Sequence, residues 1–130
     1  KIFPLDVGLL GAMTDVPASK LLVGDNCFTE FKGAFTECYV NEQLARIQMP
    51  TYYFSGNDTE IEIDFAVQTE NRVIPIEVKS EESVRSKSLK TYIDKNPSLK
   101  GLRVSMKNYI DQGWMENIGL YAIEGFLRKA

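Results

Sequence analysis

Residues 60–80, EIEIDFAVQTENRVIPIEVKS, constrain the fold of this chain more than any other stretch. Strict alternation of apolar and polar residues over positions 59–67 predicts a β-strand with one buried face. Its apolar face carries Ile61, Ile63, Phe65 and Val67, and its polar face carries Glu60, Glu62 and Asp64. Glu70-Asn71 predicts a hairpin turn, after which Ile74, Ile76 and Val78 alternate in a second strand. The stretch therefore predicts an antiparallel hairpin inside a larger sheet.

The polar residues of this hairpin have the composition of a metal site. Asp64 lies on the first strand, and Glu77 and Lys79 share one face of the second strand by parity. Two neighbouring carboxylates suit Mg²⁺ (or Mn²⁺), which keeps several waters and binds substrate phosphate through its remaining positions. A lysine beside them orients the attacking water or neutralises charge on the scissile phosphate. The pattern predicts phosphodiester hydrolysis, with Asp64 and Glu77 as metal ligands.

An ordinary solvated hairpin, in which Glu77 simply pairs with Lys79, is the alternative interpretation of the same residues. Two features favour a site. Residues 74–78 are too apolar for an exposed ribbon and indicate a strand covered on both faces. Glu37 also falls on an apolar face of a predicted helix, where an acidic side chain needs a partner or a ligand. Glu37 is therefore predicted to complete the acidic set as a third metal-site residue.

The helix that carries Glu37 is predicted from Gly33 to Gln48 and ends before Met49-Pro50. One apolar stripe contains Ala34, Phe35, Cys38 and Ala45, and a second contains Val40, Leu44 and Ile47. A helix that is apolar on two sides is usually packed between two layers. Glu37 shares the face of Val40 and Leu44, whereas Glu42 is predicted to be an ordinary solvated residue.

The remaining segments complete an α/β pattern. Residues 1–6 are expected to be extended, and residues 14–30 irregular. Helices are expected at Val7–Met13 and at Ser83–Lys95, with Leu89, Tyr92 and Ile93 inward, and a terminal helix or tail is expected from Gly125 onward. Strands are expected at Thr51–Phe54, which precedes a turn at Ser55–Asp58, and at Gly101–Met106 and Ile118–Ile123. This order predicts an α/β sandwich with a central mixed sheet of about five strands.

Composition excludes several classes of chemistry. The 130 residues contain no histidine, which removes Ser-His and Cys-His nucleophiles and His-ligated zinc. The two cysteines, Cys27 and Cys38, are too few for a disulfide framework, and a reduced, cytoplasmic protein is expected. No apolar run reaches the roughly 18 residues of a membrane span. The length predicts a single domain, and the start at Lys1 rather than Met suggests a piece of a longer protein.

Charge gives a mixed indication about nucleic acids. The net charge of −3 argues mildly against strong nonspecific binding, because neutralising phosphates needs clustered Lys and Arg. More than half of the basic residues nevertheless fall within positions 79–107. Four of them, Arg85, Lys87, Lys90 and Lys95, lie on or beside one predicted helix and are either a nucleic-acid contact or a solvated helix face.

Seven short motifs follow one another along the chain: KIFPLDVGLL, GAFTECYVNEQL, EIDFAV, IPIEVKS, SKSLKTY, GLRVSMKNY and IGLYAIEGFL. The D…ExK pair on a hairpin, preceded by a helix with Glu37, resembles the PD-(D/E)xK nuclease superfamily. The whole series resembles DUF4143, a domain found C-terminal to an AAA+ ATPase module in many bacterial and archaeal proteins. The usual Pro-Asp is Ile63-Asp64 here, which is a common variation.

The resemblance implies a restriction-endonuclease-like α/β/α sandwich with Glu37, Asp64, Glu77 and Lys79 at the acidic and lysine positions of the superfamily. It implies an AAA+ ATPase module as partner within the same polypeptide, with DNA as the candidate substrate. No GxxxxGK[ST] motif occurs, so ATP would bind only in residues upstream of Lys1. The alternatives are a catalytically weak or inactive module that regulates the ATPase or binds a partner, and a nucleic-acid-binding module without cleavage.

Overall fold

The structure is a computed structural model that describes residues 1–15, 29–56, 61–80 and 85–130. The helices are α1 (Val7–Met13), α3 (Thr29–Arg46), α4 (Lys87–Lys95) and α5 (Ile123–Leu127), with a 3-10 turn η2 (Leu120–Ala122). The strands are β1 (Thr51–Ser55), β2 (Glu62–Gln68), β3 (Val73–Val78), β4 (Gly101–Ser105), β5 (Ile110–Asp111) and β6 (Met115–Gly119).

The strands form one mixed sheet in the order β1-β2-β3-β4-β6-β5. Strands β1, β2 and β3 pair antiparallel, β4 pairs parallel with both β3 and β6, and β5 pairs antiparallel with β6. The predicted α/β sandwich with a mixed sheet is confirmed. The sheet has six strands rather than about five, because the short strand β5 forms between the strands expected at Gly101–Met106 and Ile118–Ile123.

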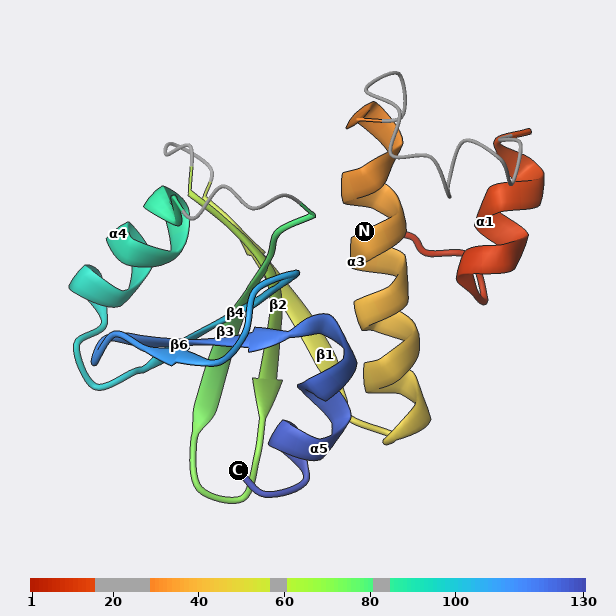
Figure 1. Ribbon diagram of the computed structural model, residues 1–130. Coiled ribbons are helices and arrows are strands. Elements are labelled where there is room, and N and C mark those ends of the chain that lie inside the picture. The colour runs from red at the N-terminus through yellow and green to blue at the C-terminus, as the bar shows by residue number, and fades with distance from the viewer. Residues whose placement is uncertain (16–28, 57–60, 81–84) are drawn as a thin grey trace.

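Helices cover both faces of this sheet (Figure 1). On one face, Val40 and Leu44 of α3 and Ile123 and Leu127 of α5 join the larger hydrophobic core with residues of β2, β3, β4 and β6. On the other face, Leu89 and Ile93 of α4 pack with Ile63 and Met115 in a smaller core. Helix α1 lies beyond α3, on the side of α3 away from the sheet (Figure 1). Helix α3 is therefore packed between two layers, as its two apolar stripes predict.

The bounds of α3 differ from the prediction at both ends. The helix begins at Thr29 rather than Gly33, and it ends at Arg46 rather than Gln48. Of the stripe residues, Cys38 is buried but Ala34 and Ala45 are exposed. Glu42 is not an ordinary solvated residue: its Oε2 is buried and has no hydrogen-bond partner among the residues that the structure describes. Burial raises the pKa of the Cys38 thiol, and the negative charge of Glu42 raises it further.

The helix α3 ends in a Schellman motif. The Met49 amide donates to the Leu44 carbonyl at 3.1 Å, and the Gln48 amide donates to the Ala45 carbonyl at 2.9 Å. Gln48 has a φ of 54°, a left-handed conformation that usually requires glycine. The chain thus turns from α3 into β1 two residues earlier than Met49-Pro50 alone indicates.

The strict alternation predicted for β2 is broken by an irregularity in its pairing with β1. Tyr52 pairs with Ala66 and Phe54 pairs with Ile63, so Tyr53 alone faces both Asp64 and Phe65. Such a β-bulge reverses which side the later residues of a strand face. Ile63 accordingly packs in the α4 core, whereas Phe65 belongs to the α3 core. The prediction that these two side chains share one face is wrong for this reason.

The C-terminal prediction also needs correction. The expected strand at Ile118–Ile123 begins earlier, at Met115, and ends at Gly119. Residues 120–127 instead form η2 and α5, because Ile123 and Leu127, four residues apart, together enter the α3 core. Helix α4 begins at Lys87, after its N-cap Ser86. Three predictions fall partly outside the described residues. They concern the first two residues of the helix predicted at Ser83–Lys95, most of the segment 14–30 with Cys27, and the end of the turn predicted at Ser55–Asp58.

A buried polar network lies between β4 and β6. Arg103 is 1% exposed, and its Nε donates to Asn117 Oδ1 at 2.7 Å. Ser105 Oγ donates to the same oxygen at 2.8 Å, while Asn117 Nδ2 donates to the carbonyls of Lys107 and Asn108. These hydrogen bonds allow a polar residue, Asn117, to be buried in β6. A prediction based on apolar residues therefore missed the start of this strand.

We expect Gln48→Gly to raise the free energy of unfolding by about 1 kcal/mol, because glycine adopts φ 54° without the Cβ clash of glutamine. Chemical denaturation measures the change. Gln48→Ala, which keeps the Cβ, should give no such gain. Gly113→Ala is the opposite case at φ 80° and should lower stability by about 1 kcal/mol. A gain from Gln48→Ala equal to that from Gln48→Gly would contradict the strain argument.

We expect Asn117→Ala to lower the free energy of unfolding by about 3 kcal/mol, because it leaves Arg103 and Ser105 without a shared buried acceptor. The exposed Asn71, whose Nδ2 donates to the carbonyl of Ala130, is the control. Asn71→Ala should change the same quantity by less than about 0.5 kcal/mol. Equal effects of the two substitutions in urea unfolding would refute the importance of the network.

Candidate functional site

Asp64 lies at the point where the ladder between β2 and β3 stops. The ladder runs from the Phe65–Ile76 pair to the Gln68–Val73 pair. Beyond it, the backbone N–H of Val78 donates to Asp64 Oδ2 at 2.8 Å. The carboxylate therefore takes the place of a backbone acceptor and is held against β3, at the residue between Glu77 and Lys79.

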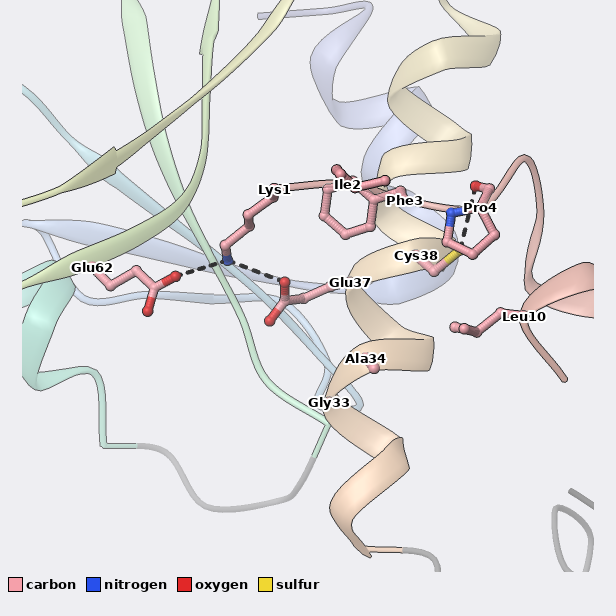
Figure 2. A pocket seen from close by; sticks show the side chains of 10 residues that line it. All are labelled: Lys1, Ile2, Phe3, Pro4, Leu10, Gly33, Ala34, Glu37, Cys38 and Glu62. Carbon is pink, nitrogen blue, oxygen red and sulfur yellow. Dashed lines mark hydrogen bonds and ion pairs between the residues drawn. The ribbon is translucent and has the colours of Figure 1, made fainter. Parts of the chain in front are cut away.

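The other oxygen of Asp64 belongs to a cluster of charges around Lys1. The Lys1 Nζ lies 3.0 Å from Asp64 Oδ1, 3.1 Å from Glu37 Oε2 and 3.1 Å from Glu62 Oε1. Figure 2 shows the ammonium between α3, which carries Glu37, and the strand that carries Glu62. We call Glu37, Glu62 and Asp64 the acidic cluster. The structure thus brings two predicted site residues, Glu37 and Asp64, to the same ammonium.

Packing of the residues that follow holds Lys1 in this position. The Phe3 ring stacks on Phe65, with ring centroids 5.6 Å apart. The Cys38 Sγ lies 3.9 Å from the Pro4 carbonyl oxygen. The N-terminal segment is thereby fixed against both β2 and α3. Sequence reasoning missed Lys1, because its partners lie 36 or more residues away, but Glu62 could have been found from its parity with Asp64.

The acidic cluster keeps Lys1 charged. Burial alone lowers the pKa of the ammonium, but hydrogen bonds to Asp64, Glu37 and Glu62 and the charge of Asp64 raise it above its ordinary value. The Lys1 side chain is 22% exposed, and that of Asp64 is 16% exposed. These are half-buried ion pairs, in which attraction is stronger than between fully solvated charges.

Glu77 and Lys79 form a second pair, on β3 and just after it. Lys79 Nζ lies 2.9 Å from Glu77 Oε1, and the Glu77 side chain is 6% exposed. The Lys79 amide also donates to the Val104 carbonyl at 2.9 Å, which continues the pairing of β3 with β4. The parity prediction that these two side chains share a face agrees with this contact.

One oxygen of Glu77 is orphaned. Its Oε2 is buried and has no hydrogen-bond partner within the described part of the chain. Arg103 pairs with Glu77 in the register of β3 and β4, and burial lowers the pKa of Arg103 while the Glu77 charge opposes that change. A buried carboxylate oxygen without a partner is costly unless a ligand completes it.

These contacts allow a test of whether the residues fit a divalent cation. Mg²⁺ is commonly held by one or two carboxylates, with waters and substrate phosphate in the other positions. Asp64 and Glu77 supply two such carboxylates from adjoining strands. Ile76 and Val78 pack in the α3 core, so Glu77 between them faces the α4 side of the sheet, whereas Asp64 meets Glu37 of α3 at Lys1. Over the described ranges, no group of three or more His, Cys, Asp or Glu side chains is close enough together to hold a metal ion. The three-residue set of Glu37, Asp64 and Glu77 stays a prediction.

The acidic cluster opens onto two hollows. The larger, of about 440 Å³, is lined by Lys1, Glu37 and Glu62 at one end and by apolar residues of the N-terminal segment, α1 and α3 (Figure 2). The smaller, of about 130 Å³, is lined by Lys1 and Asp64 together with Tyr52 and Tyr53 of the edge strand β1. Of the predicted site residues, Glu37 lines the larger hollow and Asp64 lines the smaller one.

The basic residues of the α4 region face solvent. Arg85, Lys87, Lys90 and Lys95 are all exposed. Lys90 forms an ion pair with Asp94 and lies over the Trp114 ring, 5.4 Å from its centroid. Helix α4 covers the face of the sheet opposite α3, so this basic surface is separated from the acidic cluster by the sheet (Figure 1).

No helix in the described ranges is both long enough and apolar enough to cross a lipid bilayer. The comparison with curated proteins gave no match, and the comparison with solved structures gave none either. One family model matches residues 32–122, which is more than half of the 130 residues and includes Glu37, Asp64, Glu77 and Lys79. Its description, "Domain of unknown function (DUF4143)", states no activity. The chain belongs to the DUF4143 family.

Proposed function

We propose that this DUF4143 domain is a nuclease-like, Mg²⁺-dependent phosphodiester hydrolase that acts on DNA. One observation carries the proposal: the Asp64 carboxylate accepts the N–H of Val78, the residue between Glu77 and Lys79. That hydrogen bond joins the aspartate of one strand to the ExK motif of the next. The same arrangement supports assignment to the PD-(D/E)xK superfamily, which the sequence motifs resemble.

Each residue has a role that follows from its surroundings. Asp64 and Glu77 would hold the cation, Mg²⁺ or Mn²⁺, through their carboxylates. When bound, the cation would polarise the scissile phosphate and acidify a water. In the structure the Lys79 ammonium donates to Glu77. During catalysis it would also orient the attacking water or neutralise charge on the phosphate. Glu37, on α3, would assist through a water molecule bound to the cation.

The proposal extends to the rest of the protein. The resemblance to domains that follow an AAA+ ATPase module supports a partner within the same polypeptide, located upstream of Lys1. ATP would bind in that module, since this chain has no phosphate-binding loop. A cytoplasmic location is part of the proposal and is supported by the cysteine content, since two cysteines are too few for a disulfide framework and are expected to be reduced.

The proposal predicts that the protein with Mn²⁺ or Mg²⁺ nicks plasmid DNA and that Asp64→Asn, Glu77→Gln and Lys79→Met each reduce the rate at least about 100-fold. These variants keep the size of each side chain while removing its charge. Gel electrophoresis of a supercoiled plasmid measures the rate.

Asp111→Asn is the matched control, because Asp111 also accepts from a backbone N–H, that of Gly113, and pairs with a lysine at 3.0 Å. It lies at the opposite edge of the sheet, and its substitution should leave the rate unchanged. Cleavage that survives Asp64→Asn would remove the site from consideration.

A second candidate function is a catalytically inactive module that regulates the ATPase or binds a partner. Lys1 favours it, because its ammonium already neutralises Glu37 and Asp64 and would leave a metal less favoured there. This candidate predicts no heat of Mn²⁺ binding in calorimetry. Micromolar Mn²⁺ binding that is lost in Glu77→Gln would contradict this candidate and support the hydrolase. Binding of nucleic acid without cleavage, through the exposed α4 lysines, would instead appear as a strongly salt-dependent mobility shift.

A further inference from the structure

The acidic cluster has a cation of its own. Three carboxylates converge on Lys1 Nζ at 3.0–3.1 Å, although no two of the four residues are neighbours in sequence. Glu62 and Asp64 alternate on β2, and Glu37 reaches them from α3. Like charges at such a junction repel unless a cation lies between them. Lys1 supplies that positive charge from within the chain.

The geometry of Asp64 makes this cation a competitor. Its Oδ2 is engaged by the Val78 N–H at 2.8 Å, so Oδ1 is the oxygen left for a ligand. Lys1 Nζ lies on Oδ1 at 3.0 Å. A divalent ion bound to Oδ1 would stand within a few ångströms of the ammonium, where repulsion between the two cations is strong. Both cannot occupy Oδ1 in this arrangement.

Lys1 is also placed so that it can leave. Its side chain retains contact with solvent, and Glu62, its outermost partner, has a side chain that is 56% exposed. The chain is anchored two residues later by the stacking of Phe3 on Phe65. Rotation of the flexible lysine stem would therefore release the ammonium without moving the N-terminal segment.

We propose that Lys1 is a built-in counter-ion that competes with a divalent cation for Asp64 and thereby sets the cation concentration at which the site fills. The inference rests on the proposed hydrolase function and adds its regulation. It assigns to Lys1 a role in setting the affinity of the site for the cation, which neither the ExK motif nor the hairpin indicates. A substrate or partner that draws Lys1 away would favour metal binding at the same site.

Isothermal titration with Mn²⁺ of the unaltered chain and of Lys1→Met tests the competition. Methionine keeps most of the stem and removes the charge, so we expect the Mn²⁺ dissociation constant to fall at least about tenfold. Without metal, Lys1→Met should lower Tm by about 4 °C because three carboxylates lose their cation, and Mn²⁺ should restore it. Restoration of Tm is a readout that does not depend on cleavage.

Lys100→Met is the matched control. Lys100 Nζ bridges Asp111 at 3.0 Å and Glu116 at 3.7 Å, and its side chain is 29% exposed, close to that of Lys1. It should lower Tm without changing the Mn²⁺ affinity. Adding Asp64→Asn to Lys1→Met should abolish the gained affinity, which assigns the competition to that carboxylate.

The outcomes separate the two proposals. Tighter, Asp64-dependent Mn²⁺ binding in Lys1→Met than in the unaltered chain supports the inference. Equal, Asp64-dependent binding in both overturns the inference while leaving the hydrolase proposal intact. Absence of Asp64-dependent heat in both proteins overturns the hydrolase proposal and the competition with it.

Discussion

The break in the alternation of β2 is the constraint on which the rest of this structure depends. Because Tyr53 faces two residues of β2 instead of one, Ile63 enters the α4 core and Phe65 enters the α3 core. Asp64 lies between them, at the end of the ladder with β3. A regular strand would keep Ile63 and Phe65 on one face. The bulge therefore lets β2 contribute a side chain to the hydrophobic core on each face of the sheet. It also places the Asp64 carboxylate where it accepts the N–H of Val78.

Electrostatics then divides the candidate site into two parts. Glu37, Glu62 and Asp64 converge on Lys1, while Glu77 pairs with Lys79. The backbone N–H of Val78 connects the two parts through Asp64. With Arg103 opposite Glu77, these four acidic side chains face three basic ones, Lys1, Lys79 and Arg103, which leaves a single negative charge that a divalent cation would offset. The orphaned oxygen of Glu77 points to the same need. The site therefore has its own cations and still lacks positive charge.

Local periodicity predicted the hairpin, the shared face of Glu77 and Lys79 and the two-sided packing of α3. It could not predict the bulge, because IEIDFAV alternates without interruption and the extra residue is fixed only by the register with β1. The buried strand β6 was misplaced because Asn117 satisfies Arg103 and Ser105, a relationship across strands that no single segment carries. Lys1 was missed for the same reason, since its partners follow 36 to 63 residues later.

A crystal structure of this chain soaked in Mn²⁺ tests the central claim most directly, because anomalous scattering locates the ion independently of any activity. The account predicts an anomalous peak within coordination distance of Asp64 Oδ1 and of a Glu77 oxygen, with the Lys1 ammonium displaced from Asp64. A well-ordered site with no such peak, and with Lys1 still bound to all three carboxylates, would contradict it.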